Sequence, residues 1–237
     1  MLRRLIPTAR VFASRYMPAG FASYSQCGED RIIDFFLASC GVTNATYIDA
    51  GCSHPVVGNN TYLLSRRNFR GICIDPTPGL AELYRRHRPR DVFLASALVP
   101  GSETEVLMHC FDQSMINTVS VDHADQYRSF GYEKMASQRV PALNLATVFD
   151  QQGVSDLDVL CLDVEGLDLQ IVTGLDLKRV RPKLICVEVV RYGQDKAPII
   201  ETGFAEHLLA NGYVKYADTY INQIFADARA MQTLKLI

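Results

Sequence analysis

The chain has 237 residues, a net charge of -2 and a hydrophobic content of 48%. These values are typical of a globular protein with one large domain, and they exclude a disordered chain. Nothing in this charge balance indicates a nucleic-acid partner, which would need a clustered basic face, so we expect none. No hydrophobic run is long enough to cross a bilayer, so we also expect no integral membrane segment.

The seven cysteines do not form a metal-binding or disulfide pattern. Their number is odd, no CxxC pair occurs, and Cys73, Cys161 and Cys186 lie inside hydrophobic runs. This usage indicates small buried residues in a reducing compartment, and it predicts a cytoplasmic protein. The sequence carries no pattern that defines an oligomeric state.

The first 23 residues differ from the rest in charge. They contain four arginines, and the first acidic residue of the chain is Glu29. A transit peptide or a membrane-surface helix would have this composition. Pro7 and Pro18 interrupt the helical pattern, and no signal-peptide core is present. We therefore expect a basic N-terminal arm at 1–23, followed by a single domain at 24–237.

Helical and strand patterns alternate along the first half of this domain. We expect helices at 25–40, 59–68 and 80–87, and strands at 46–49, 71–75, 92–99 and 105–111. Residues 112–137 are polar and lack a strong periodic pattern, which predicts a long loop or small insertion. Such loops often cover active sites, and the aromatic side chains of this one are candidate pocket walls: Tyr127, Phe130 and Tyr132.

The second half continues the alternation. We expect helices at 144–151, 167–175 and 204–211, and strands at 158–163, 183–190, 213–216 and 220–225. Strands that are hydrophobic throughout and separated by helices indicate a parallel sheet covered on both faces. The last two strands lie close in sequence, so we expect an antiparallel pair at the edge. The predicted fold is α/β: a Rossmann-like, doubly wound, mostly parallel seven-stranded sheet with an antiparallel edge.

Acidic residues follow the hydrophobic strands. Asp49, Asp75, Asp163 and Glu188 each come at the end of a predicted strand, and Glu165 lies two residues beyond Asp163. In an open doubly wound sheet, ligands bind beyond the carboxyl ends of the strands. Carboxylates at that edge must be solvated, paired or used in chemistry. These five residues therefore mark the candidate site.

The first two acids predict a nucleoside-type ligand. Asp49 is followed by Gly51, where the absence of a side chain allows a ligand to approach the backbone closely. Asp75 ends the next strand and can accept hydrogen bonds from both hydroxyls of a ribose. Each acid alone has a simpler interpretation, which is a helix N-cap for Asp49 and a turn residue before Pro76 for Asp75.

The glycine pattern discriminates between nucleoside ligands. A dinucleotide site needs G-x-G-x-x-G to bind pyrophosphate at a helix N-terminus, whereas this turn contains one glycine, Gly51. S-adenosylmethionine has no phosphate, and an acidic turn suits its ammonium and sulfonium groups. We therefore expect S-adenosylmethionine. Two alternatives remain open: a nicotinamide-dependent oxidoreductase, and a non-catalytic nucleoside-binding scaffold of the same fold.

The later acids are candidates for catalysis. Asp163, Glu165 and Glu188 could supply a general base for a substrate hydroxyl. They could also hold a divalent cation such as Mg²⁺ through their oxygens. A third interpretation is a carboxylate cluster that is satisfied by backbone amides, Arg191 or Lys183.

His54 is the fourth catalytic candidate. It lies just after the first strand, and the near-neutral pKa of an unperturbed imidazole suits a base close to the transferred group. The alternative is a loop histidine held beside Pro55.

Five short motifs follow one another along the chain. They are YSQCGED at 24–30, YIDAGCSHP at 47–55, NNTYLL at 59–64, LDVEGLD at 162–168 and ICVE at 185–188. In this order they resemble the FkbM-type methyltransferases, a branch of the Rossmann-like enzymes that use S-adenosylmethionine. The resemblance extends from about residue 24 to residue 225.

The resemblance implies O-methylation of a hydroxyl on a sugar or natural-product-type small molecule. It also implies contacts with the cofactor along the site: Asp49 and Gly51 at the methionine part, Asp75 at the ribose, Ser96 or Ala97 near adenine, and Ser25, Gln26 and Glu29 from the N-terminal helix. The chain departs from the family pattern at Cys52, where alanine is more common, and at Asp75, where glutamate is common. The sulfonium carries its own leaving group, so the protein would mainly align the acceptor oxygen with the methyl carbon.

Overall fold

The computed structural model describes residues 22–193 and 195–234, so the predicted arm at 1–23 lies almost entirely outside the described residues. A seven-stranded sheet forms the centre, in the order β11-β12-β8-β7-β1-β2-β3. Its strands are β1 (Thr46–Ala50), β2 (Arg70–Ile74), β3 (Val92–Leu94), β7 (Val159–Leu162), β8 (Leu184–Glu188), β11 (Tyr213–Asp218) and β12 (Asn222–Asp227).

The pairing of these strands confirms the predicted fold class. The pairs β1–β2, β1–β7, β2–β3 and β7–β8 are parallel. Strand β12 pairs antiparallel with both β8 and β11, which makes the antiparallel edge. The predicted hairpin of the last two strands is therefore correct.

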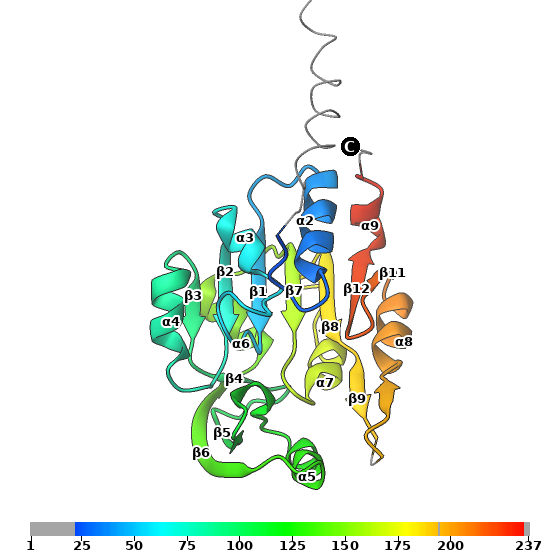
Figure 1. The fold of residues 1–237 in the computed structure, drawn as a ribbon. Helices are drawn as coiled ribbons and strands as arrows, with labels where there is room; N and C mark the ends of the chain where they lie inside the picture. Colours follow the sequence, from blue (N-terminus) through cyan, green and yellow to red (C-terminus); the bar gives the residue numbers. More distant parts are fainter. Residues whose placement is uncertain (1–21, 194, 235–237) are drawn as a thin grey trace, which may run out of the picture.

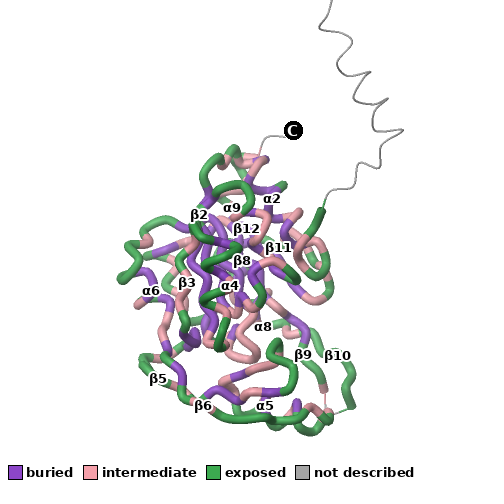
Figure 2. Tube along the Cα trace, turned by 60° about the vertical axis from the view of Figure 1, so that its left-hand side comes forward, coloured by how far each residue is buried: buried purple, intermediate pink, exposed green. Residues whose placement is uncertain are grey.

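Helices cover both faces of the sheet (Figure 1). One face carries α2 (Glu29–Ser39), α3 (Tyr62–Arg66) and α4 (Leu80–His87), and the other carries α6 (Leu145–Gln152), α7 (Asp168–Thr173) and α8 (Gly203–Ala210). Successive strand residues point to opposite faces, so Tyr47 packs with the first group and Ile48 with the second. A short helix, α9 (Ala228–Met231), follows β12 and packs on the first group. Figure 2 shows the strands as the buried centre of the molecule.

Residues 112–137, predicted as a long loop or small insertion, belong to a small insertion that begins at β4. The insertion contains a three-stranded sheet, a 3-10 turn and a helix: β4 (Ala97–Leu98), β5 (Glu105–Phe111), η2 (Ser114–Ile116), α5 (Val121–Ser129) and β6 (Lys134–Leu143). The sequence predicts β5 but neither α5 nor β6, because β6 is mostly exposed and is held by its antiparallel ladder with β5. Helix α5 buries only Ala124 and Tyr127, so its sequence lacks a hydrophobic stripe.

A second correction concerns the strand predicted at 92–99. The chain leaves the main sheet after β3, and β4 joins the small sheet instead. Ser96 lies at the crossing, where its backbone amide donates to the carbonyl of Leu94. A hairpin that was not predicted follows β8, formed by β9 (Val190–Tyr192) and β10 (Pro198–Ile200).

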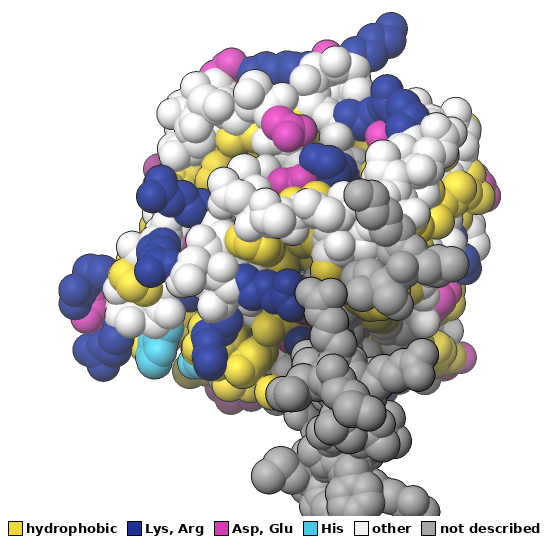
Figure 3. Space-filling view, turned by 90° about the horizontal axis from the view of Figure 1, so that it is seen from above, with side chains coloured by type: hydrophobic (Ala, Val, Ile, Leu, Met, Phe, Trp, Pro, Cys, Tyr) yellow, Lys and Arg dark blue, Asp and Glu magenta, His cyan; other side chains and the backbone are white. Residues whose placement is uncertain are grey.

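The insertion lies beyond the carboxyl ends of the parallel strands, which is the edge expected to bind a ligand (Figure 1). Figure 3 views the opposite end of the molecule, where charged side chains alternate with hydrophobic and uncharged ones. Within residues 22–193 and 195–234, no helix combines the length and hydrophobicity needed to span a membrane.

Candidate active site

A cavity of about 1010 Å³ lies at the carboxyl ends of β1, β2, β7 and β8. Three loops of the main domain line it: residues 51–54 and 57–60 after β1, 75–80 after β2, and 163–165 after β7. The insertion adds a hydrophobic wall from Met108, Met115, Ile116 and Val119. The volume is at the upper end for small-molecule sites, and it is sufficient for a nucleoside cofactor together with an acceptor.

Asp49 is fixed on one of its two carboxylate oxygens. Its Oδ2 accepts hydrogen bonds from Thr61 Oγ1 at 2.5 Å and Asn59 Nδ2 at 3.3 Å. Arg88 Nη1 lies 3.9 Å from the same oxygen. Burial raises the pKa of Asp49, while the charge of Arg88 and the two hydrogen bonds act in the opposite direction. Asp49 also lines the cavity, as the sequence predicted.

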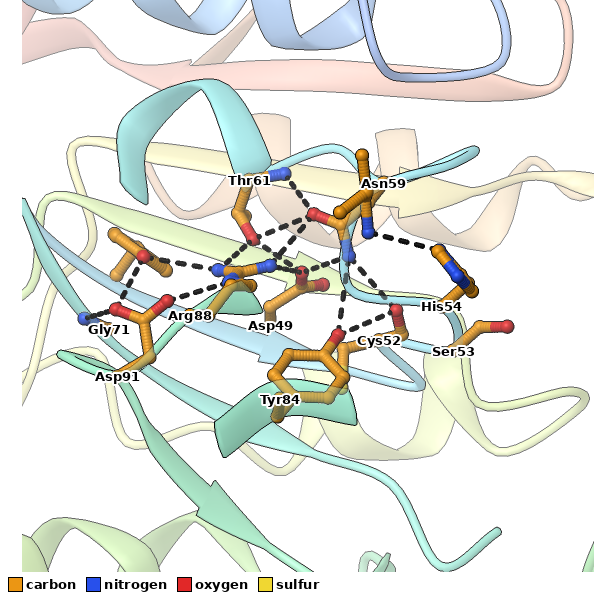
Figure 4. A network of polar contacts seen from close by, with 12 residues as sticks. Asp49, Cys52, Ser53, His54, Asn59, Thr61, Gly71, Tyr84, Arg88 and Asp91 are labelled. Atoms are coloured by element: carbon orange, nitrogen blue, oxygen red, sulfur yellow. Dashed lines mark hydrogen bonds and ion pairs between the residues drawn. The ribbon is translucent and has the colours of Figure 1, made fainter. Parts of the chain in front are cut away.

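Behind Asp49 lies a network centred on Arg88, whose side chain is fully buried (Figure 4). Its Nε pairs with Asp91 at 2.6 Å, Nη1 donates to Asn59 Oδ1 at 3.0 Å, and Nη2 donates to Thr61 Oγ1 at 2.9 Å. Nη2 also donates to the hydroxyl of Tyr47 at 3.1 Å. The sequence does not mark Arg88 as a residue of the site, because an arginine among other basic residues at a helix end is normally a surface charge.

Asp75 connects the loops after β1 and β2. Its Oδ2 accepts the backbone amide of Ser53 at 2.9 Å, and its Oδ1 accepts that of Thr77 at 2.8 Å. The side chain lines the same cavity as Asp49. A carboxylate oxygen can accept two hydrogen bonds, so both oxygens keep capacity for a ligand hydroxyl.

Asp163, Glu165 and Glu188 converge in the cavity. Each offers an oxygen that lies within 4.8 Å of those of the other two. Asp163 and Glu188 share a hydrogen bond, and the Tyr127 hydroxyl donates to Glu165. Burial, followed by the charge of Asp168, raises the pKa of Asp163 to about 7. Burial and the charge of Asp163 raise the pKa of Glu165 to about 8.

Glu188 has the strongest tendency to keep its proton. Burial raises its pKa to about 11, reinforced by repulsion from Asp163 and Glu165. Three carboxylates this close cannot all be ionised, so the group retains a proton at neutral pH. The third interpretation of the cluster included Arg191 and Lys183 as partners, but in the structure Arg191 pairs with Glu201 and Lys183 pairs with Asp158.

The turn that carries Glu165 is held by two side chains. Asp168 accepts the backbone amides of Val164 at 2.8 Å and Gly166 at 3.2 Å, and Thr118 donates to the Glu165 carbonyl at 2.8 Å. Glu165 has a φ of 57°, a left-handed conformation that costs roughly 1 kcal/mol in a residue with a side chain. The local contacts hold this conformation, and Glu165 is among the residues that line the cavity.

His54 is exposed at the cavity, and its Nδ1 accepts the backbone amides of Val56 at 3.2 Å and Val57 at 3.0 Å. In the neutral ring the proton then resides on Nε2, which leaves no free lone pair for a base. This arrangement favours the loop-histidine interpretation.

The remaining predicted cofactor residues are divided. Gln26 lines the cavity, whereas Ser96 and Glu29 are not among its lining residues. Glu29 Oε1 accepts hydrogen bonds from Thr219 at 2.6 Å and Asn222 at 3.2 Å, and so anchors α2 to the β11–β12 hairpin. Burial alone would raise the pKa of Glu29, but these hydrogen bonds lower it. Of the two residues expected near adenine, Ala97 lines the cavity and Ser96 does not.

The insertion carries the three aromatic residues that the sequence marked as candidate pocket walls: Tyr127, Phe130 and Tyr132. Tyr127 packs with Phe111, Phe130 and Tyr132 and places its hydroxyl on Glu165. Phe130 and Tyr132 support Tyr127, and none of these three side chains is among the cavity-lining residues. Met115, Ile116 and Val119 line the cavity, but the sequence has no periodic pattern from which to assign them.

Known families and structures provide an independent comparison. The family model described as the methyltransferase FkbM domain matches residues 49–214. No curated protein sequence matches the chain. The match to the family model spans more than two thirds of the chain.

Solved structures similar to the chain include three methyltransferases. A TehB-like SAM-dependent methyltransferase from Corynebacterium glutamicum is 14% identical, with 93% of this chain and 98% of that chain covered and a TM-score of 0.44. The 1,6-didemethyltoxoflavin-N1-methyltransferase of Burkholderia thailandensis is 12% identical, with coverages of 94% and 86% and a TM-score of 0.43. An O-methyltransferase from Bacillus cereus in complex with SAH is 15% identical, with coverages of 94% and 89% and a TM-score of 0.42. Similarity of this degree carries no argument about activity.

Proposed function

The chain belongs to the FkbM methyltransferase family, and from this premise we propose that it transfers the methyl group of S-adenosylmethionine to a hydroxyl of a small molecule. The observation that carries the proposal is that Asp49 and Asp75, from adjacent parallel strands, line one cavity with three proton-sharing carboxylates. The family membership gives the methyltransferase activity, and the choice of cofactor and acceptor rests on the site.

The residues of the cavity fit this cofactor. Asp49 would bind the ammonium of the methionine part, and Asp75 the ribose hydroxyls. Asn60 lines the cavity and has a buried Oδ1 without a hydrogen-bond partner among the described residues, so it has an acceptor available for a ligand. The cavity also carries several carboxylates, which repel pyrophosphate and disfavour a dinucleotide.

The chemistry assigned to the chain is proton removal and alignment. S-adenosylmethionine supplies the methyl group on a sulfonium that departs as a neutral thioether. Asp163 and Glu165, with pKa values raised to about 7 and 8, are matched to accept the proton of an acceptor hydroxyl near neutral pH. Glu188 keeps its own proton and shares a hydrogen bond with Asp163, which orients that carboxyl group. We assign the role of general base to Asp163, assisted by Glu165.

The same three carboxylates could hold a divalent cation such as Mg²⁺, because their oxygens converge within 4.8 Å. The cation would lower the pKa of the acceptor hydroxyl and would replace the shared proton. This is a second assignment for the same group, and chelation distinguishes it from the first.

Calorimetry with S-adenosylhomocysteine and with NAD tests the cofactor. We expect wild-type protein to bind S-adenosylhomocysteine, and we expect Asp49→Ala to lower the affinity for it by about 100-fold. Asp150→Asn is the matched control, because Asp150 is exposed on α6 and pairs with Arg179 at the surface. Binding of NAD without S-adenosylhomocysteine would overturn the proposal in favour of an oxidoreductase.

Methyl transfer from labelled S-adenosylmethionine to a panel of polyols, sugars and amines tests the acceptor. Products methylated on oxygen would support the proposed hydroxyl acceptor, and methylation of amines alone would overturn it. Cofactor binding without transfer to any acceptor would favour a non-catalytic scaffold.

A further inference from the structure

We infer that Arg88 is a positioning residue that acts through Thr61 and Asn59 to orient Asp49, and thereby gives the site its recognition of the amino-acid part of the cofactor. The inference rests on the proposed function, since it concerns the same cavity. Arg88 is not among the lining residues and would not touch the cofactor itself.

Arg88 determines the direction of the hydrogen bond that the Thr61 hydroxyl donates. A guanidinium can only donate, so the contact from Arg88 Nη2 at 2.9 Å occupies Thr61 Oγ1 as an acceptor. The hydroxyl must then direct its own hydrogen elsewhere. Asp49 Oδ2 lies at 2.5 Å, and the competing acceptor, Asn59 Oδ1, lies at 3.2 Å and already receives Arg88 Nη1. Arg88 therefore directs the hydroxyl of Thr61 to Asp49.

Arg88 also determines the orientation of the Asn59 side-chain amide. Arg88 Nη1 donates to Asn59 Oδ1 at 3.0 Å, so the amide oxygen faces Arg88. The Nδ2 group on the other side donates to the carbonyl of Cys52 at 2.9 Å and to Asp49 Oδ2 at 3.3 Å. One guanidinium thus determines the direction of two donors, and both converge on the same oxygen of Asp49 (Figure 4).

The second carboxylate oxygen of Asp49, Oδ1, differs from Oδ2 in its contacts. Among the residues that the structure describes, no hydrogen-bond donor to Asp49 Oδ1 is found, and Asp49 lines the cavity. The carboxylate is therefore fixed on its inner side and available on its outer side. A fixed carboxylate with one available oxygen recognises a cationic hydrogen-bond donor, which on this cofactor is the α-ammonium group.

Arginine is required for this geometry. Three separate groups of its fork are used: Nε on Asp91, Nη1 on Asn59, and Nη2 on Thr61 and Tyr47. Pairing with Asp91 alone would neutralise the buried charge, but it would leave the hydroxyl and the amide free to turn. A lysine offers one compact donor group and cannot reach all of these acceptors in a planar arrangement.

Calorimetry with two probes tests the inference. S-adenosylhomocysteine carries the ammonium group, whereas 5′-methylthioadenosine has the same nucleoside and lacks the amino-acid part. Thr61→Val keeps Arg88 and removes only the hydroxyl, and we expect it to lower the affinity for S-adenosylhomocysteine by about tenfold. Arg88→Met should lower this affinity by about 10–100-fold, and Arg88→Lys should recover part of the loss. The affinity for 5′-methylthioadenosine should change by less than about threefold in all three variants.

Two controls complete the design. Arg85→Met removes an exposed arginine of α4 that pairs with Glu82 at the surface, and it should leave both affinities unchanged. In an Asp49→Asn background, Thr61→Val should have little further effect, because both changes act on one contact. Equal weakening of both probes by Thr61→Val, or no change in either, would overturn the inference. Failure of wild-type protein to bind S-adenosylhomocysteine would instead overturn the proposed function.

Discussion

The Cα of Gly51 lies so close to the end of β7 that an added Cβ would be 1.7 Å from the carbonyl oxygen of Asp163. Gly51 also has a φ of 72°, in the left-handed region. Its backbone therefore contacts the backbone of the neighbouring strand end directly. This contact brings the turn after Asp49 and the carboxylate of Asp163 to one cavity.

Replacing Gly51 should therefore disrupt both the fold and the site. We expect Gly51→Ala to lower the free energy of unfolding by about 2–4 kcal/mol, because the methyl group overlaps backbone that cannot move without shifting β7. Urea denaturation measures the change. Gly153→Ala is the matched control, since Gly153 has a φ of 66° with no atom within 4 Å of an added Cβ. It should cost only about 1 kcal/mol, and an equal loss in both variants would contradict the close contact.

The raised pKa of Asp163 predicts how the rate depends on pH. A general base must be ionised to accept a proton, so kcat/KM should rise with pH through the region around the pKa of about 7. Asp163→Asn should lower kcat by about 100-fold or more and remove this rise. Initial rates between about pH 5.5 and pH 9 measure the profile. Glu105→Gln, on the exposed surface of β5, should retain the wild-type profile, and a flat wild-type profile would contradict the assignment.

Glu188 should make the unliganded protein less stable at high pH. Its folded-state pKa is raised above the unfolded value, so the folded state holds a proton that the unfolded state releases. The stabilising contribution of Glu188 to the free energy of unfolding is complete below its pKa in the unfolded chain. This contribution is lost as the pH rises toward its pKa in the folded protein. Glu188→Gln mimics the protonated form, so its free energy of unfolding should rise relative to that of wild type by about 4 kcal/mol from about pH 5 to about pH 8.

Urea unfolding of the two proteins at both pH values measures this difference. Glu133→Gln replaces an exposed glutamate and serves as the control. A stability difference that is independent of pH would show that Glu188 does not retain its proton in the fold.

Tyr127, which lies in the insertion, should affect the pH dependence of the reaction through its hydrogen bond to Glu165. Its hydroxyl donates to Glu165 and lowers the pKa of that residue, against the upward effects of burial and Asp163. Tyr127→Phe should therefore raise the pKa of Glu165 above its wild-type value of about 8, move the part of the rate profile that depends on Glu165 to higher pH and lower kcat about 3–10-fold. S-adenosylhomocysteine affinity should stay the same. Tyr132→Phe, whose ring centroid lies 6.0 Å from that of Tyr127, is the control. An unchanged profile in Tyr127→Phe would indicate that α5 serves only to pack.

Chelation distinguishes a proton from a cation at the three carboxylates. Because Asp163 and Glu188 satisfy one another through a shared proton, we expect activity to survive extensive chelation. Elemental analysis of the purified protein should find no stoichiometric metal. Loss of activity that Mg²⁺ restores would favour the cation assignment, with all three residues as ligands.

Much of the fold is present in local patterns. The hydrophobic strands and the acids that end them depend on residues close together in the sequence, so Asp49, Asp75 and Asp163 could be assigned to one edge of the sheet. The antiparallel partner of β11 was predicted for the same reason, because a short connection leaves little choice of pairing. The predictions were wrong where a segment is stabilised by distant partners. Strand β6 depends on its ladder with β5, and the strand predicted at 92–99 divides because β4 pairs with β6.

The meeting of the five carboxylates follows from local patterns in the sequence. Parallel strands bring their carboxyl ends to one edge, so the register of hydrophobic and acidic residues is sufficient to predict Asp49, Asp75, Asp163, Glu165 and Glu188 there. The protonation and orientation of each carboxylate come instead from the packing of the folded chain. Burial, shared protons and hydrogen-bond direction depend on residues far away in sequence, such as Arg88 behind Asp49 and Tyr127 on Glu165. These contacts form when α4 and α5 pack into place, and no local pattern encodes them.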